Sequence, residues 1–427
     1  MGHVETAVDS HAPRHALVAR ATARAASAST ATRALAVATV SLALGLYQLG
    51  QPSLWLDESF TARAMKFSYA QLVHEHHWLY YTLMKPWVAL AGTSELALRL
   101  PSVFAGAVAC ALLVPLGDRL LGRPVGTIAG LVLAFNAFVV QWSQQARSYS
   151  FVLLGAVVAT MALVRLGRDR SRRSWLLYAA ALGGLLLFQP LSAGLLGAAH
   201  ALAARGYRWR VVTAGAAVVI LASPYLMGVY RRDSEGGTLV WNKPATGETI
   251  TRALLELSGA VGIGLILALC ALAFVRRERW LLVSWAIAPF GILLALTPVA
   301  DVFIDRYLIV SAPAFALLVA VALVGLRGPW RVGAIGTLAV GVVAGLLIWY
   351  APDGSDNWTG QDWNAATRYA MAHGGATVDP FWARSAYRYY GGIEADNGLY
   401  LALAGVGGGP QSTLEARFGD DLRAERR

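Results

Sequence analysis

The stretch "WLLYAAALGGLLLFQPLSAGLLGAAHALAA", residues 175–204, contains no Asp, Glu, Lys or Arg. It lies between two strongly basic segments, "RLGRDRSRRS" at 165–174 and "RGYRWR" at 205–210. A membrane-spanning helix needs about twenty apolar residues, and basic loops favour the cytoplasmic side. One long helix would place the two basic segments on opposite sides of the membrane. Because proline interrupts the helical ladder, we predict a break at Gln189 and Pro190 that makes a hairpin of two short helices.

The rest of the chain has a similar composition. Of its 427 residues, 56% are hydrophobic and 14% are charged, and the mean hydropathy is +0.51. This composition is too apolar for an ordinary soluble protein and indicates an integral membrane protein. The formal net charge of +11 comes from short basic bursts between apolar segments, so we expect no nucleic-acid partner. Cys110 and Cys270 both lie in apolar segments, which excludes a disulfide framework.

The apolar segments predict an all-α polytopic membrane protein with about eleven spans. The predicted spans are 34–50, 100–117, 124–142, 148–164, 175–189, 190–204, 211–230, 257–275, 280–300, 307–326 and 332–350. The cytoplasmic loops would be 119–123, 165–173, 205–210, 276–279 and 327–331, all short and basic. We expect residues 1–33 to be a disordered cytoplasmic N-terminus, residues 34–350 the membrane module, and residues 351–427 a small extracytoplasmic segment.

Two acids follow the first predicted span. In "LWLDESF" (54–60), Asp57 and Glu58 stand near the start of an outer loop, 51–99, that is far longer than the hairpins elsewhere. Long ordered loops usually carry function, and the Trp and Tyr residues of this one suit helices lying in the membrane interface. Capping of a helix N-terminus would explain the acid pair in a soluble protein. At the edge of a membrane an acid pair is costly, and we favour a functional role.

Two arginines on the outer side indicate an anionic ligand. Arg147 in "QWSQQARSYS" (141–150) and Arg306 in "DVFIDRYL" (301–308) stand at the outer entrances of predicted spans, against the usual cytoplasmic preference. The planar guanidinium group suits phosphate oxygens. Pairing of Arg306 with Asp301 or Asp305 is the alternative reading.

Two interpretations are open for each of two other features of the long loop, "HEHHW" and the tyrosine pair. "HEHHW" (74–78) could bind a metal ion, but its histidines lack helical spacing, so we assign no metal and keep a divalent metal ion as an open alternative. Tyr80 and Tyr81 either line a sugar site or anchor the loop at lipid headgroups. The chain has no GxxxxGK[ST] motif and no GxGxxG after a strand, so soluble nucleotide chemistry is not expected.

Several segments together resemble a known family. They are "LWLDESFTA" (54–62), "LYYTLMKPWVALAGTSELALRLPSVFAG" (79–106), "QARSYSFVLL" (145–154), "DRYLIVSAPAFALL" (305–318), "DWNAATRYA" (362–370) and "AYRYYGG" (386–392). In order and placement they resemble the GT-C type membrane glycosyltransferases, in particular the protein-mannosyltransferase-like and aminoarabinose-transferase-like branch, glycosyltransferase family 39. The chain departs from the pattern at "HHWLYY" (76–81), where many members have His-Pro-Pro or Lys-Pro-Pro before the aromatic pair.

The resemblance implies transfer of a sugar, with inversion, from a polyprenyl-phosphate donor to an acceptor hydroxyl at the outer face of the plasma membrane. It implies that Asp57 is the general base, with Glu58 beside it as the weaker candidate, which caps, orients or binds a cation. Arg306 and Arg147 would bind the donor phosphate. His77, Tyr80 and Tyr81 would contact the sugar or the acceptor.

The sugar would be mannose, arabinose or a similar one, and the acceptor a glycan, a lipid or a protein. Besides these partners, the protein would contact membrane lipids. The Ala- and Arg-rich composition suggests a bacterial plasma membrane. A sugar or lipid transporter, or a flippase without transferase activity, is the alternative from another class, although no intramembrane carboxylates or paired repeats stand out as they commonly do in transporters. A membrane scaffold would leave the long acidic and aromatic loop unexplained.

Overall fold

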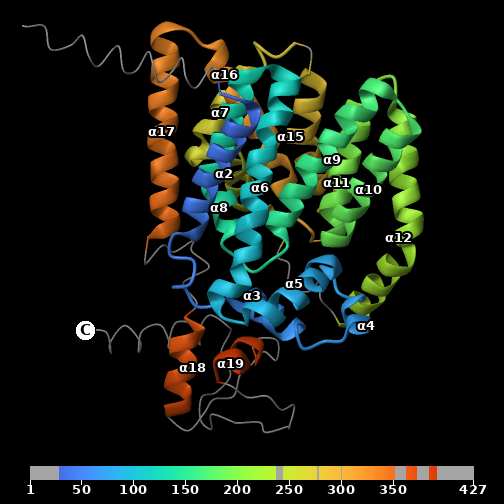
Figure 1. Ribbon diagram of the computed structural model, residues 1–427, viewed down its shortest axis with the longest axis vertical. Coiled ribbons are helices and arrows are strands. Elements are labelled where there is room, and N and C mark those ends of the chain that lie inside the picture. The colour runs from blue at the N-terminus through green and yellow to red at the C-terminus, as the bar shows by residue number, and fades with distance from the viewer. Residues whose placement is uncertain are drawn as a thin grey trace, which may run out of the picture.

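The computed structural model describes residues 28–236, 244–276, 278–299, 301–351, 362–372 and 384–391. Across these residues the regular structure is helical and contains no strand. Long helices run side by side along the long axis of the molecule, and shorter helices lie across one end of them (Figure 1). The predicted all-α polytopic class is confirmed.

The helix bounds place each functional segment. The first part of the chain forms α2 (Thr30–Leu46), α3 (Leu56–Ala64), α4 (Tyr69–Leu72), α5 (Trp78–Ala91), α6 (Glu95–Leu121), α7 (Arg123–Ala134), α8 (Ala137–Ser143), α9 (Tyr149–Asp169), α10 (Arg172–Phe188), α11 (Pro190–Ala203) and α12 (Arg208–Gly236). The second part forms α13 (Gly247–Ser258), η2 (Ala260–Gly262), α14 (Ile263–Ala271), α15 (Arg279–Leu296), η3 (Asp305–Ser311), α16 (Ala312–Gly325), α17 (Gly328–Tyr350), α18 (Trp363–Ala372) and α19 (Arg384–Gly391).

Each predicted span falls on helical structure. Among the described residues, six helices are long and apolar enough to cross a membrane, or up to eight if each of two bent pairs counts as one span. The apolar helices α2 and α11 are shorter. The chain is thus a multi-pass membrane protein, and the total of eleven spans stays a prediction.

The predicted break at Gln189 and Pro190 is confirmed. Helix α10 ends at Phe188, and α11 begins at Pro190. The side chain of Gln189 caps the new helix, because its Oε1 accepts hydrogen bonds from the backbone N–H groups of Leu191 at 2.7 Å and Ser192 at 3.3 Å. Pro190 occupies the first helical turn, where a missing N–H costs nothing.

Two predicted spans contain a bend that the sequence analysis did not predict. The span 257–275 starts at the end of α13, and α13 meets the η2–α14 segment at a bend of 103°. The backbone at the bend takes positive φ at four consecutive residues from Gly259 to Gly262, which an α-helix cannot accommodate. The segment 124–142 bends by 62° between α7 and α8, where Asn136 caps the second helix by accepting from the N–H of Phe138 at 2.9 Å.

The boundaries of the predicted domains are described only in part. Helix α2 begins at Thr30 with Ser29 as its cap, so residues 28–33 belong to ordered structure rather than to a disordered N-terminus. Residues 1–27 lie outside the described residues, and the C-terminal segment is described only in α18 and α19. The limits of the three predicted domains therefore stay predictions.

The loops of the membrane module separate by charge. Three predicted cytoplasmic loops contact one another through Arg168 and Arg119 and through Arg210 and Arg170. The guanidinium of Arg205 lies over the ring of Trp280, at the start of the predicted span 280–300. Helices α3, α4 and α5, which build the predicted first outer loop, lie across the other end of the long helices, beside α18 and α19 (Figure 1). The basic loops and the acidic loop therefore occupy opposite ends of the bundle.

Candidate active site

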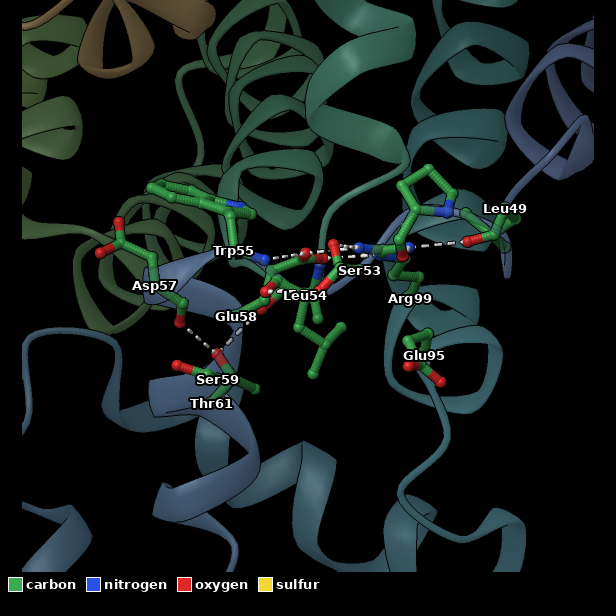
Figure 2. Close-up of polar contacts among 12 residues, drawn as sticks. Leu49, Ser53, Leu54, Trp55, Asp57, Glu58, Ser59, Thr61, Glu95 and Arg99 are labelled. Atoms are coloured by element: carbon green, nitrogen blue, oxygen red, sulfur yellow. Dashed lines mark hydrogen bonds and ion pairs between the residues drawn. The ribbon is translucent and has the colours of Figure 1, made fainter. Parts of the chain in front are cut away.

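Helix α3 points its two acids in different directions. Asp57 and Glu58 lie in its first turn, and successive residues of an α-helix are rotated by about 100°. Figure 2 shows the Glu58 carboxylate directed toward Arg99 and the Asp57 carboxylate directed away from it. The Glu58 side chain is 0% exposed, whereas that of Asp57 is 29% exposed. The two neighbouring acids therefore have different environments.

Glu58 belongs to a buried ion pair with Arg99 of α6. The guanidinium donates from Nε to Oε1 at 2.8 Å and from Nη2 to Oε2 at 2.6 Å, which is a bidentate geometry. The backbone N–H groups of Ala146 and Trp55 also donate to this carboxylate, at 2.7 and 3.3 Å. The remaining N–H groups of Arg99 donate to the carbonyls of Leu49, Pro52 and Ser53. Glu58 therefore anchors α3 to α6 (Figure 2), and the bond from the Ala146 N–H anchors it to the turn that precedes α9.

Asp57 lies between two arginines from distant parts of the chain. Its Oδ2 is 3.6 Å from Nη2 of Arg147 and 3.9 Å from Nη2 of Arg306. Both distances are those of ion pairs and exceed hydrogen-bond length. The carboxylate therefore feels both positive charges and keeps lone pairs free for another donor.

Arg147 lies in the turn between α8 and α9, and contacts with residues of the first outer loop hold its guanidinium group in place. Its Nη1 donates to the hydroxyl of Tyr81 at 3.2 Å and to the backbone carbonyl of Asp57 at 3.3 Å, and its Nη2 lies 3.2 Å from Nε2 of His77. Because a guanidinium only donates, Nε2 of His77 must accept. Nδ1 of His77 lies 2.9 Å from the carbonyl of Phe188, which only accepts, so Nδ1 must carry the proton. The contacts define a neutral imidazole with one tautomer.

His77 is protected against protonation. Burial, and in second place the positive charge of Arg147, lower the pKa of His77 well below its usual range. A charged imidazole would carry a second N–H toward the guanidinium and repel it. The neutral state of His77 is thus part of the support for Arg147.

Arg306 enters the site from the first turn of η3. Asp305 accepts from the backbone N–H of Arg306 at 2.6 Å, which fixes the start of this turn. The guanidinium carbon of Arg306 lies 5.9 Å from the ring centroid of Trp142 and 5.8 Å from that of Tyr149, within cation–π range. Among the described residues, the buried Nε atoms of Arg147 and Arg306 have no hydrogen-bond partner. Two buried cations therefore share one carboxylate and retain unused donors.

The two tyrosines predicted to contact sugar are buried, and Tyr81 contacts Arg147. Tyr80 and Tyr81 are each 1% exposed, and His77 is 7% exposed. Burial raises the pKa of Tyr81 to about 12, so its hydroxyl stays protonated while it accepts from Arg147. The sugar or acceptor contact of these three residues stays a prediction, since the contacts that the structure shows are to protein groups.

Comparison with known proteins shows which family and which fold this chain resembles. Residues 76–227 match the family described as dolichyl-phosphate-mannose-protein mannosyltransferase, a range that includes His77 and Arg147. The structure of ArnT from Cupriavidus metallidurans bound to undecaprenyl phosphate superposes with a TM-score of 0.57 at 16% identity, over 84% of this chain and 74% of that one. The apo state of the same protein gives a TM-score of 0.56 at 18% identity and the same coverage. The chain has the fold of a GT-C glycosyltransferase.

The resemblance seen in the sequence to the GT-C type and to the mannosyltransferase-like branch is therefore confirmed. Among curated proteins no match was found. Asp57 and Arg306 lie outside the segment that matches the family, so their place beside Arg147 comes from the fold of this chain.

Within the described part of this chain, no group of three or more His, Cys, Asp or Glu side chains could hold a metal ion. In "HEHHW", Glu75 forms an ion pair with Arg232 of α12, and His77 contacts Arg147 as described above. The backbone carbonyls of Glu75 and His76 accept from the Tyr225 hydroxyl at 3.2 and 2.9 Å. These contacts give the segment a role in joining α12 to the site.

Several residues of the site were not singled out in the sequence. Arg99 is a lone cation in the apolar run "LALRLPSVFAG" (96–106), and a cation in such a run calls for a buried partner. Trp142 and Tyr149, whose rings flank Arg306, carry no sequence signal that separates them from ordinary core aromatics.

Proposed function

We propose that this protein is an inverting glycosyltransferase that uses a polyprenyl-phosphate-linked sugar donor at the extracytoplasmic face of the plasma membrane. The observation that carries the proposal is the Asp57 carboxylate between the guanidinium groups of Arg147 and Arg306, at 3.6 and 3.9 Å. A base beside two phosphate-binding groups is what this reaction requires. The undecaprenyl phosphate bound to ArnT, which shares the fold, supports a lipid phosphate as the donor carrier.

The proposed reaction is a single displacement. The acceptor hydroxyl gives its proton to the Asp57 carboxylate while its oxygen forms a bond with the anomeric carbon. The bond from that carbon to the phosphate oxygen breaks, and the polyprenyl phosphate leaves with the electron pair. Attack from the face opposite the leaving group inverts the anomeric configuration.

The arginines serve the leaving group. A phosphate that loses the sugar gains negative charge, and fixed guanidinium groups stabilise that charge where it develops. The Nη2 atoms of Arg147 and Arg306 lie 3.6 and 3.9 Å from Asp57, beyond hydrogen-bond length, so a phosphate would compete with two long ion pairs to Asp57 and with no hydrogen bond to its carboxylate. When both arginines bind phosphate, the Asp57 carboxylate is released to accept the acceptor proton.

Substitution of Arg306 by alanine is expected to weaken binding of undecaprenyl phosphate by about 10- to 100-fold. The lost charge-assisted hydrogen bonds contribute about 1.5–3 kcal/mol. The measurement is titration of the purified protein in nanodiscs with undecaprenyl phosphate. Arg252→Ala is the matched control, because Arg252 forms a surface pair with Glu248 and should leave the Kd unchanged. Equal affinity of Arg306→Ala and the parent protein would remove Arg306 from the phosphate site.

His77 is expected to make the protein less stable in mild acid. Its pKa is lowered in the folded state, so below a pH of about 6.5 the unfolded chain takes up a proton that the folded chain does not. Stability therefore falls as the pH falls, by at most about 1.4 kcal/mol per pH unit from this group. His77→Gln keeps one donor and one acceptor without titrating, and its unfolding midpoint should depend less steeply on pH between 7 and 5. Equal slopes in both proteins would contradict the lowered pKa of His77 in the folded state.

The activity itself can be tested without knowing the acceptor. Purified protein in nanodiscs would be incubated with cell-envelope extract and a panel of polyprenyl-phosphate sugars that includes mannose and arabinose. Transfer of one labelled sugar supports the proposal, and release of free sugar alone does not. Comparison of envelope glycans, glycolipids and glycoproteins between a deletion strain and its parent would then identify the acceptor class.

A further inference from the structure

The C-terminal helices α18 and α19 pack against the part of the chain that leads into α3 (Figure 1). We call this helix pair the C-terminal clamp. Ala386 is fully buried, and Tyr387 is 8% exposed. Tyr389 and Tyr390 pack against the apolar cluster that includes Leu54. The clamp therefore covers apolar surface next to the helix that carries Asp57.

The Tyr390 hydroxyl bridges two segments that flank the site. It donates to Oε1 of Glu95 at 3.1 Å, because a carboxylate accepts. It accepts from the backbone N–H of Leu54 at 2.6 Å. Leu54 is fully buried, so without Tyr390 water could not reach its N–H to replace the lost hydrogen bond. This contact lies three residues before Asp57.

The segment before α3 is held from two sides. Arg99 binds the carbonyls of Pro52 and Ser53, and Tyr390 binds the N–H of Leu54. The Ser53 hydroxyl also accepts from the backbone N–H of Asn364 in α18, at 3.2 Å. The clamp and the buried Glu58–Arg99 pair thus hold the same short segment, whose conformation sets where α3 begins.

We propose that the C-terminal clamp positions Asp57 between the two arginines, and that Tyr390 is the positioning residue that transmits this effect. The inference rests on the proposed function of Asp57. Tyr390 does not touch the reacting groups. It holds Leu54, and through Leu54 the first turn of α3. The C-terminal segment is then part of the catalytic unit rather than an accessory.

Tyr390→Phe tests the inference, with Tyr389→Phe as the matched control. Both variants keep the ring and lose one hydroxyl, but the Tyr389 hydroxyl donates to the carbonyl of Thr93 instead of contacting Leu54. In Tyr390→Phe, amide exchange in the peptide covering 51–60 should accelerate about tenfold, as expected for a buried N–H that loses its partner. The kcat should fall about tenfold with the donor KM within twofold of the parent. Tyr389→Phe should change neither quantity.

The outcomes separate the two proposals. If the parent protein transfers no sugar from any polyprenyl-phosphate donor, the proposed function fails, and amide exchange alone decides whether Tyr390 orders the lead-in to α3. Faster exchange with unchanged kcat would overturn the positioning role, and unchanged exchange would overturn the clamp. If Tyr390→Phe does not accumulate as folded protein, Ser53→Ala removes the acceptor of the Asn364 N–H, the other contact of the clamp with the segment before α3. The same two measurements then decide, with Glu248→Ala as the control.

Discussion

Asp57→Asn is expected to lower kcat by about a thousandfold while the protein still folds and inserts in the membrane. Asparagine has nearly the same shape but cannot take the proton of the acceptor hydroxyl, and a positioned base contributes about 10²- to 10⁴-fold to the rate. Its side chain is partly exposed, and its two ion pairs within the described part of the chain are long, so folding loses little. The measurement is sugar transfer from a polyprenyl-phosphate donor, with undecaprenyl phosphate binding measured in parallel.

Asp301→Asn is the matched control for this experiment. Asp301 is an exposed acid of the outer loop that leads to Arg306, and its loss should leave kcat within twofold of the parent. Near-normal turnover of Asp57→Asn would show that another group is the base. A transporter would tolerate the Asp57 substitution, so transport without transfer, unaffected in Asp57→Asn, would favour that class instead.

Glu58→Gln is expected to destabilise the protein by about 3–5 kcal/mol, because it leaves the charge of Arg99 buried without its partner. The side chains of Glu58 and Arg99 are 0% and 4% exposed, so water cannot replace the lost carboxylate. Reversible unfolding in mixed micelles would measure this loss. Glu248→Gln breaks the exposed pair with Arg252 and serves as the control, with no measurable change expected.

The double variant Glu58→Gln, Arg99→Gln separates pairing from packing. Removing both charges should restore part of the stability that the single variant loses, since the main cost is an unpaired buried charge. Additive losses in the double variant would contradict that explanation. Together with Asp57→Asn, these variants test whether Asp57 acts as the base while Glu58 stabilises the fold through Arg99.

Much of the helical layout follows from local sequence. Apolar runs of membrane-spanning length mark the long helices, and the charge rule together with Pro190 places the break between α10 and α11. The bend between α13 and α14 was missed, because hydropathy averages over a window and does not report backbone direction. The glycines of "SGAVGIG" (258–264), which permit positive φ at Gly259 and Gly262, were the available signal.

The sequence singled out several residues of the candidate site, but it did not predict which of them contact one another. Asp57, Arg147 and Arg306 stood out because charges at the edge of a membrane are costly. The partner of Glu58 was not predicted, since Arg99 lies in a separate helix and the pair forms only when α3 packs against α6. The tautomer of His77 could not be predicted either, because it depends on Phe188 and Arg147, which neighbour it only in the folded chain.

The sequence by itself determined the class of the protein, the order of its helices and the separation of basic from acidic loops, because hydropathy and charge act through local composition. The tertiary structure alone decided which acid faces the arginines and which is buried as an anchor. That distinction depends on the rotation of α3 about its axis, and Arg99, Ala146 and Tyr390, contributed by three other segments, hold that rotation. Two adjacent carboxylates of the same chemistry acquire different roles because tertiary packing gives them different partners.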